Sequence, residues 1–199
     1  MRAFVALELP EAFADETAAL SRALVEACDG RFVDPENLHL TLAFLGEVGE
    51  AEVRSAMAAL DAARLGVGPV RLSATGLGTF GRARDATLWL GIRKDPQLLS
   101  LSTHVREELS ARGLSYDEKG FLPHVTLARR ARLPRGGLGE LAFPLPDVAT
   151  RLTLFRSILS PDGARYKPLY TVELDARPRS QRQACPKISE RKNTSPITR

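Results

Sequence analysis

Hydrophobic and polar positions along the chain alternate between the period of a strand and the period of a helix. Residues 2–9 (RAFVALEL) have strand character. Residues 10–28 then predict a helix, with Pro10 at its start and Gly30 beyond its end as a C-terminal cap. Residues 37–46 (NLHLTLAFLG) predict the next strand.

The same two periods continue through the remainder of the chain. We expect helices at 49–65 and 96–113, and strands at 69–80, 86–92, 122–130, 150–160 and 164–174. The last two strands form a hairpin, because Asp162-Gly163 between them is a turn signal.

The order of these elements repeats. Each half contains a strand, a helix and then a strand with the motif His-x-Thr, at His39 and at His124. This indicates an internal duplication of about 85 residues and two α+β lobes meeting face to face, with a cleft between their sheets.

Composition separates a folded body from a tail. The 199 residues are 44% hydrophobic and 26% charged, as is ordinary for a soluble globular protein, and residues 1–176 predict a single domain. Residues 177–199 hold seven basic residues and one acid, so the tail carries +6 and the body −2 of the formal net charge of +4. We expect this proline-punctuated tail to be disordered. The high pI therefore does not mark the body as a polyanion binder.

The sequence indicates neither a membrane-spanning segment nor a metal site. No apolar run approaches the roughly 20 residues that span a bilayer. The N-terminus lacks the pattern of a signal peptide, so we expect a cytoplasmic protein. Cys28 and Cys185 form no CxxC motif and have no histidine at ligand spacing, which argues against zinc and favours two free thiols.

The two His-x-Thr motifs place polar groups opposite the core. In a strand, residues two apart share a face, so His39 and Thr41 lie on the face opposite four apolar residues. These are Leu38, Leu40, Leu42 and Phe44. In the second motif, His124 and Thr126 likewise lie opposite Val125 and Leu127.

Two imidazoles across a cleft suit acid–base chemistry at phosphorus. Histidine titrates near pH 6.5, so one ring can accept a proton while the other donates one. The two threonine hydroxyls can donate hydrogen bonds to phosphate oxygens, and no cofactor is required. A single His-x-Thr motif in a strand is usually structural. Here the motif occurs twice, with Leu or Pro before each histidine, which favours a functional role. The third histidine, His104, falls on a predicted helix surface and is assigned no role.

The chain resembles the RNA 2′,3′-cyclic phosphodiesterases, or 2′-5′ RNA ligases, of the 2H phosphoesterase superfamily. The resemblance rests on five segments within residues 1–175: RAFVALELP, PENLHLTLAFLGEV, GLGTFGRARDATLWLGI, FLPHVTLARR and LFRSILSPDGARY. It implies a bilobal α+β fold, with two pseudo-symmetric lobes of antiparallel sheet and outer helices around a central cleft. It also implies hydrolysis of RNA 2′,3′-cyclic ends to 2′-phosphates, without metal, by a monomer.

The resemblance also implies residue roles. His39 becomes the proton donor, His124 the proton acceptor, and Thr41 and Thr126 the phosphate-binding hydroxyls. The residues alone leave open which histidine is the acid, because the site is nearly symmetric. In the reverse direction, 2′-5′ ligation, the two roles exchange.

Neighbouring residues leave further alternatives. Strict alternation directs Arg130 toward the His124 face, whereas the family pattern favours Arg129 as a phosphate ligand. A β-bulge or the end of the strand would reconcile the two. Phe80 is the candidate for base stacking, whereas Trp89 is assigned to the core. Tyr166 either lines the cleft or closes the sheet, and we favour the structural role.

The expected partner is an RNA with a 2′,3′-cyclic end, such as a tRNA half, or a small cyclic nucleotide. The rival function is a non-catalytic module that binds RNA ends or nucleotides in the same cleft. The retention of both histidines and both threonines counts against that rival.

Overall fold

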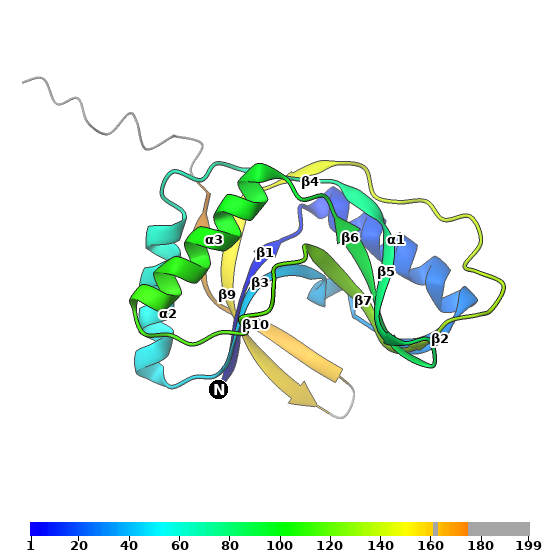
Figure 1. The fold of residues 1–199 in the computed structure, drawn as a ribbon, viewed down its shortest axis with the longest axis horizontal. Coiled ribbons are helices and arrows are strands. Elements are labelled where there is room, and N and C mark those ends of the chain that lie inside the picture. The colour runs from blue at the N-terminus through cyan, green and yellow to red at the C-terminus, as the bar shows by residue number, and fades with distance from the viewer. Residues whose placement is uncertain (161–162, 175–199) are drawn as a thin grey trace, which may run out of the picture.

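The structure, a computed structural model, describes residues 1–160 and 163–174, which form helices and strands (Figure 1). The elements are β1 (Arg2–Glu8), α1 (Glu11–Ala27), β2 (Asp29–Phe32), the 3-10 helix η1 (Pro35–Asn37), β3 (His39–Glu47), α2 (Glu50–Ala63), β4 (Val70–Leu72), β5 (Ala74–Arg82), β6 (Asp85–Ile92), α3 (Pro96–Ala111), β7 (His124–Arg132), β8 (Asp147–Ala149), β9 (Arg151–Ser160) and β10 (Gly163–Glu173). The predicted tail, Cys185 and the centre of the β9–β10 turn lie outside the described residues.

The structure departs from the expected elements in three places. Short strands β2 and β8 were not predicted, and the strand expected over 69–80 is divided into β4 and β5. The prediction that Gly30 caps α1 is wrong. The helix ends where the Cys28 N–H donates to the Leu24 carbonyl at 2.9 Å, and Gly30 lies in β2. A Cβ on Gly30 would lie 3.2 Å from the Ala131 Cα, so glycine here permits a close approach between strands.

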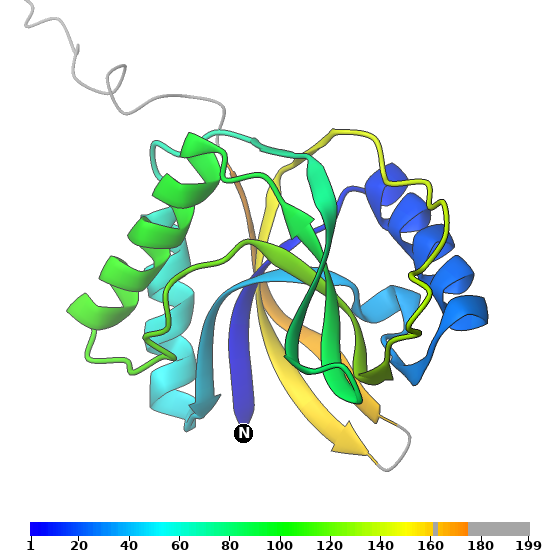
Figure 2. The same ribbon diagram turned by 45° about the vertical axis from the view of Figure 1, so that its right-hand side comes forward.

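Most strands of the described chain join one antiparallel sheet that falls into two groups. The order is β10-β9-β1-β3-β7-β6-β5, with β2 also pairing with β7. The two groups meet where β3 runs beside β7 (Figure 2). The one residue pair between these strands is Leu40 with Val125. The lobes therefore join edge to edge at one residue pair, where the sequence suggested two sheets face to face. We call β1, β3, β9 and β10 with α2 and α3 the first lobe, and β2, β5, β6 and β7 with α1 the second.

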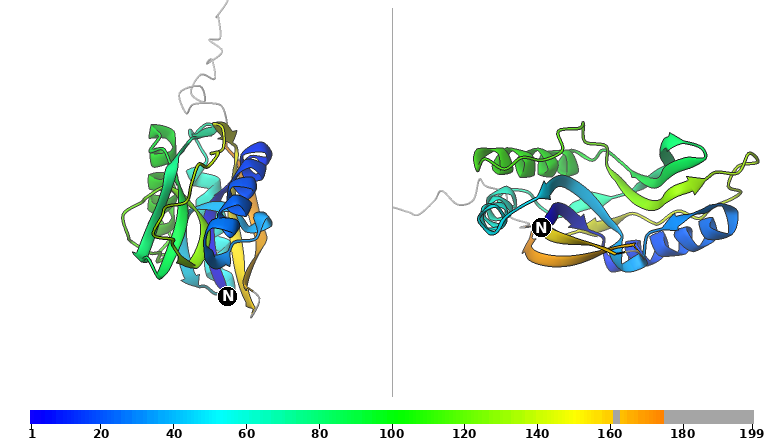
Figure 3. Two further views of the ribbon diagram at one scale, coloured as in Figure 1. Left: turned by 90° about the vertical axis from the view of Figure 1, so that its right-hand side faces the viewer. Right: turned by 90° about the horizontal axis from the view of Figure 1, so that it is seen from below.

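The two halves of the sequence exchange helices between the lobes. Helix α1, from the first half of the chain, packs against β2 in the second lobe. Helix α3, from the second half, packs beside α2 and against β3 in the first lobe. Figure 3 shows α2 and α3 together at one end of the molecule and α1 at the other. None of the described helices is long and apolar enough to cross a membrane.

The buried face of β3 follows the predicted alternation only as far as Leu42. Leu38, Leu40 and Leu42 are buried, as expected. The pairing of β1 with β3 then shifts between the pairs Ala6–Thr41 and Val5–Ala43, which changes the phase of the strand. Phe44 is consequently only half-buried and pairs with Phe4, so its assignment to the core face was wrong.

The absence of a side chain at Gly78 makes room for Trp89. These residues pair across β5 and β6, and a Cβ on Gly78 would lie 2.1 Å from the indole ring. The indole therefore lies flat over the glycine backbone, and Gly78 fixes its position.

Replacing Gly78 by alanine is expected to displace Trp89. We expect a loss of about 1–3 kcal/mol in the free energy of unfolding, because the added methyl group overpacks the site. Trp89 is the only tryptophan in the chain, so its fluorescence emission reports the displacement directly. Gly136→Ala is the matched control, since a Cβ there meets no atom within 4 Å. An unchanged emission spectrum and unfolding midpoint in Gly78→Ala would contradict this assignment.

Candidate active site

The two predicted histidines are the first residues of β3 and β7, the strands that join the lobes. They directly precede Leu40 and Val125, the one pair that links these strands. Because the strands are antiparallel, His39 lies on the side of the pair where the other strand has Thr126, and His124 on the side of Thr41. All four side chains share the face opposite the core. The junction therefore brings both motifs together, as the sequence predicted.

Both imidazoles are held by the same kind of hydrogen bond. The His39 Nδ1 lies 2.7 Å from the Asn37 carbonyl oxygen, and the His124 Nδ1 lies 2.7 Å from the Leu122 carbonyl oxygen. A carbonyl oxygen only accepts, so each Nδ1 carries the proton. The Nε2 of each ring is therefore the atom available for proton transfer.

The Nε2 of His39 is already engaged by its own motif. It lies 3.0 Å from the Thr41 hydroxyl oxygen. In a neutral ring protonated at Nδ1, the Nε2 accepts, so the hydroxyl donates to it. Thr41 is thus oriented by His39 in the absence of a ligand.

Aromatic rings surround His39 on the first-lobe side. Its ring centroid lies 4.8 Å from that of Phe4, 5.1 Å from that of Tyr166 and 6.3 Å from that of Phe155. Tyr166 meets the imidazole edge-on at 90°. Tyr166 therefore lines the site beside His39, which is the alternative that the sequence left open and did not favour.

This environment disfavours a charge on His39. The pKa of His39 is lowered from 6.5 to about 4, chiefly by burial and also by the neighbouring charges of Arg129 and His124, against the opposing effect of the Asn37 hydrogen bond. His39 is therefore neutral at neutral pH in the free protein.

His124 packs against a different pair of rings in the second lobe. Its centroid lies 5.3 Å from that of Phe80 and 5.8 Å from that of Trp89. Trp89 pairs with Thr126 across β6 and β7, so it shares the face of the second motif. Its assignment to the core was therefore wrong. Phe80 is 42% exposed, as a base-stacking residue must be.

Asn37, which sequence reasoning did not single out, ties His39 to the β10 strand. Its side-chain amide donates to the Ala164 carbonyl oxygen at 3.1 Å and accepts from the Tyr166 N–H at 3.2 Å. Its own carbonyl oxygen accepts from His39. One residue therefore positions both the imidazole and the tyrosine ring that packs on it. The only signal in the sequence was its place two residues before the histidine.

A β-bulge settles the geometry at Arg129 and Arg130. The pairing of β7 with β6 shifts between the pairs Trp89–Thr126 and Leu88–Ala128, so the alternation of β7 changes before Arg129. Arg129 consequently reaches the groove beside His39, and Arg130 does not line it. A second shift follows, because Arg130 and Ala131 lie opposite the single residue Gly30 of β2, and Arg130 has φ 52°, the one positive value among the described non-glycine residues.

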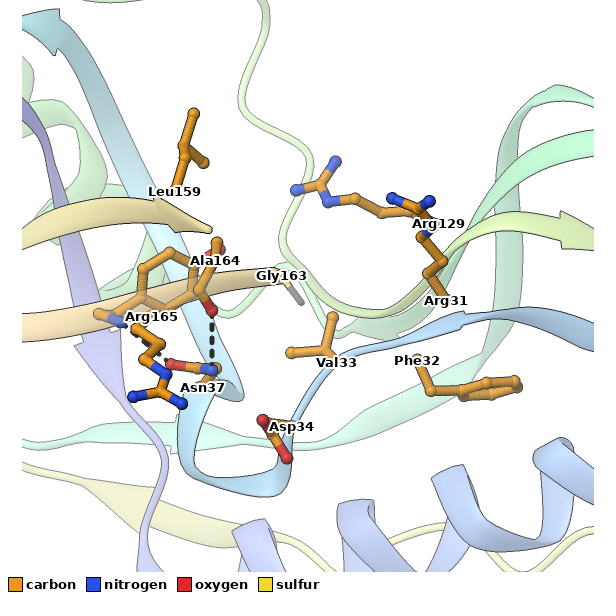
Figure 4. Close-up of a pocket in the computed structure, with 11 residues that line it drawn as sticks. Arg31, Phe32, Val33, Asp34, Asn37, Arg129, Leu159, Gly163, Ala164 and Arg165 are labelled. Carbon is orange, nitrogen blue, oxygen red and sulfur yellow. Dashed lines mark hydrogen bonds between the residues drawn. The ribbon is translucent and has the colours of Figure 1, made fainter. Parts of the chain in front are cut away.

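A groove between the lobes adjoins His39. Its volume is about 680 Å³, and Figure 4 shows the side chains that line it. The lining residues are Arg31, Phe32, Val33, Asp34, Asn37, Arg129, Leu159, Gly163, Ala164, Arg165 and Tyr166. Within residues 1–160 and 163–174, no group of three or more histidine, cysteine or acidic side chains is placed to hold a metal ion.

The environment of His39 predicts a titration near pH 4. The folded state favours the neutral ring, so its contribution to stability is present above pH 6.5 and is lost as the pH falls from 6.5 to about 4. That loss amounts to up to about 3 kcal/mol. Proton NMR of the His39 ring against pH measures the midpoint, with His39→Gln to assign the resonance. A midpoint near 6.5 would contradict the inferred burial.

Comparison with known proteins agrees with this arrangement. The sequence profile described as LigT-like phosphoesterase matches residues 7–89 and 90–166, two consecutive segments that each contain one His-x-Thr motif. An RNA 2′,3′-cyclic phosphodiesterase of Thermotoga maritima is 32% identical over 88% of this chain and 96% of that protein. The crystal structure of Escherichia coli LigT in apo form matches with a TM-score of 0.71 and 31% identity, over 86% of this chain and 96% of that one. The complex of E. coli LigT with 3′-AMP matches with a TM-score of 0.68 and 31% identity, over 87% and 96% of the two chains. This chain therefore belongs to the LigT-like phosphoesterase family.

Proposed function

We propose that this enzyme hydrolyses RNA 2′,3′-cyclic phosphodiester ends to 2′-phosphomonoesters. The observation that carries the proposal is the matched bond of both Nδ1 atoms to carbonyl oxygens, 2.7 Å in each motif. It leaves two Nε2 atoms for proton transfer at the junction of the lobes. The relative from T. maritima is named for this activity.

The proposed reaction is an in-line displacement at phosphorus. The His124 Nε2 takes a proton from water as the water oxygen bonds to phosphorus. The bond from phosphorus to O3′ breaks, and the His39 Nε2–H protonates the departing O3′. The product has a 2′-phosphate and a 3′-hydroxyl group. Thr41, Thr126 and Arg129 stabilise the charge on the non-bridging oxygens, and Phe80 stacks on the terminal base. No step uses a metal ion.

The role of His39 as the donor requires a ligand-induced change in protonation. In the free protein its ring is neutral at neutral pH, because its pKa is lowered to about 4. An anionic phosphate beside the ring favours the charged form and raises the pKa of His39 on binding. The Thr41 hydroxyl, released from Nε2 when that atom gains a proton, turns to the phosphate. The reverse reaction, 2′-5′ ligation, exchanges the two histidine roles.

Removing either imidazole is expected to abolish turnover. We expect His39→Ala and His124→Ala to lower kcat by about 10²-fold or more each on a 2′,3′-cyclic oligonucleotide, in excess chelator. His104→Ala, on α3, is the matched control. Binding without turnover in the unaltered protein would favour the rival function, a non-catalytic module.

A sulfur analogue separates the acid from the base. When sulfur replaces the bridging O3′, the leaving thiolate needs no proton, so we expect activity to return in His39→Ala and not in His124→Ala. Return of activity in His124→Ala alone would reverse the two roles.

The bulge predicts different roles for the two adjacent arginines. We expect Arg129→Gln to lower kcat/KM by about 10- to 100-fold, since a charge-assisted contact to the phosphate is lost. Arg130→Gln should stay within about twofold of the unaltered enzyme, because Arg130 does not line the groove. Steady-state kinetics on one cyclic substrate compares the two, and equal losses would refute the bulge assignment.

A further inference from the structure

The groove beside His39 contains more positive charge than one cyclic phosphate needs. Arg31 and Arg129 enter it from β2 and β7, and Arg165 lines the opposite wall from β10 (Figure 4). None of the three forms an ion pair with any residue that the structure describes. Asp34 is the one carboxylate in the lining. Among the described residues, the lining therefore holds three cations and a single carboxylate.

The placement of Arg31 is unfavourable without a ligand. It pairs directly with Arg129 across β2 and β7, and like charges at directly opposed positions destabilise a sheet. The register shift of β7 before Ala128 turns Arg129 toward the groove as well. Guanidinium groups on neighbouring strands can each bind a separate phosphate group of one ligand. An anion from a ligand would relieve the repulsion.

The groove is large enough for a nucleotide and is continuous with the site. Its volume of about 680 Å³ is far above that of a phosphate ion and is typical of small-molecule sites. Asn37 and Tyr166, which contact His39, form part of its wall. Val33 and Leu159 add apolar surface where a base or ribose can lie.

We propose that this groove binds the nucleotide that precedes the cyclic end. Arg31 and Arg165 hold the phosphate on the 5′ side of the terminal nucleoside, while Arg129 serves the cyclic phosphate. The enzyme therefore selects polynucleotide ends over cyclic mononucleotides. This inference rests on the proposed function and names the substrate class of the same site.

Three substrates separate the possibilities. They are adenosine 2′,3′-cyclic phosphate with a free 5′-hydroxyl, the same nucleotide with a 5′-phosphate, and the adenylyl dinucleotide with a 2′,3′-cyclic end. We expect kcat/KM to be about 10- to 100-fold higher for the two that carry the second phosphate. A further gain for the dinucleotide over the 5′-phosphorylated nucleotide would show that the groove also binds the preceding nucleoside.

The variant Arg31→Gln/Arg165→Gln tests the residues. We expect it to lose about 10- to 100-fold more kcat/KM on the dinucleotide than on the 5′-hydroxyl mononucleotide, chiefly through KM. Arg132→Gln, an exposed arginine of β7 outside the groove, should leave that ratio unaltered. Equal losses on all three substrates, or a wild-type enzyme indifferent to the second phosphate, would overturn the inference.

A binding measurement distinguishes the groove assignment from the proposed catalytic function. Calorimetry gives the affinity of the same three compounds for the unaltered chain and for the double variant. Tighter binding of the dinucleotide that depends on Arg31 and Arg165, with no turnover of any compound, would overturn the proposed function and support the groove assignment. Turnover of all three compounds, without any preference in binding or kcat/KM, would do the reverse.

Discussion

The pairing of Leu40 with Val125 is the contact on which the site depends. Both side chains are fully buried, and they are the only pair through which β3 and β7 join the lobes. The burial of two aliphatic side chains fixes the junction on the core face, and the pleat then directs His39 and His124 to the other face. One residue of slippage in either strand would exchange the faces and bury an imidazole in place of a leucine or valine. Hydrophobic burial thus enforces the catalytic register.

The charges around His39 oppose its protonation. Glu8 pairs with His39 across β1 and β3, but its carboxylate binds Arg151 at 3.0 Å and accepts from the Thr153 hydroxyl. Burial lowers the pKa of His39, and the neighbouring charge of Arg129 acts in the same direction. In the proposed reaction, a bound phosphate would supply a negative charge beside the ring, which favours its protonated form.

The sequence allowed prediction of the features set by local pattern. The helices, most of the strands and the paired motifs follow from periodicity, and the bilobal fold is confirmed by the match to E. coli LigT. Features set by pairing between distant strands were missed. DGRF is too short and polar to indicate β2, yet its pairing with β7 places Arg31 opposite Arg129. Trp89 is a large apolar residue within an apolar strand, so the sequence places it in the core. Its pairing with Thr126 and the space left by Gly78 show that its side chain lies on the sheet face of the second His-x-Thr motif.

Internal duplication explains the placement of the two histidines but not the division of their roles. Equivalent strands start with equivalent imidazoles, and each Nδ1 is fixed by the carbonyl two residues earlier. The surroundings then differ. His39 is enclosed by three aromatic rings and bonded to Thr41, whereas His124 packs against Phe80 and Trp89 beside an open edge. Equivalent strands position the two imidazoles in the same way, whereas burial among aromatic rings lowers the pKa of His39. The backbone thus sets the position of each ring, and the neighbouring side chains make the two environments unequal.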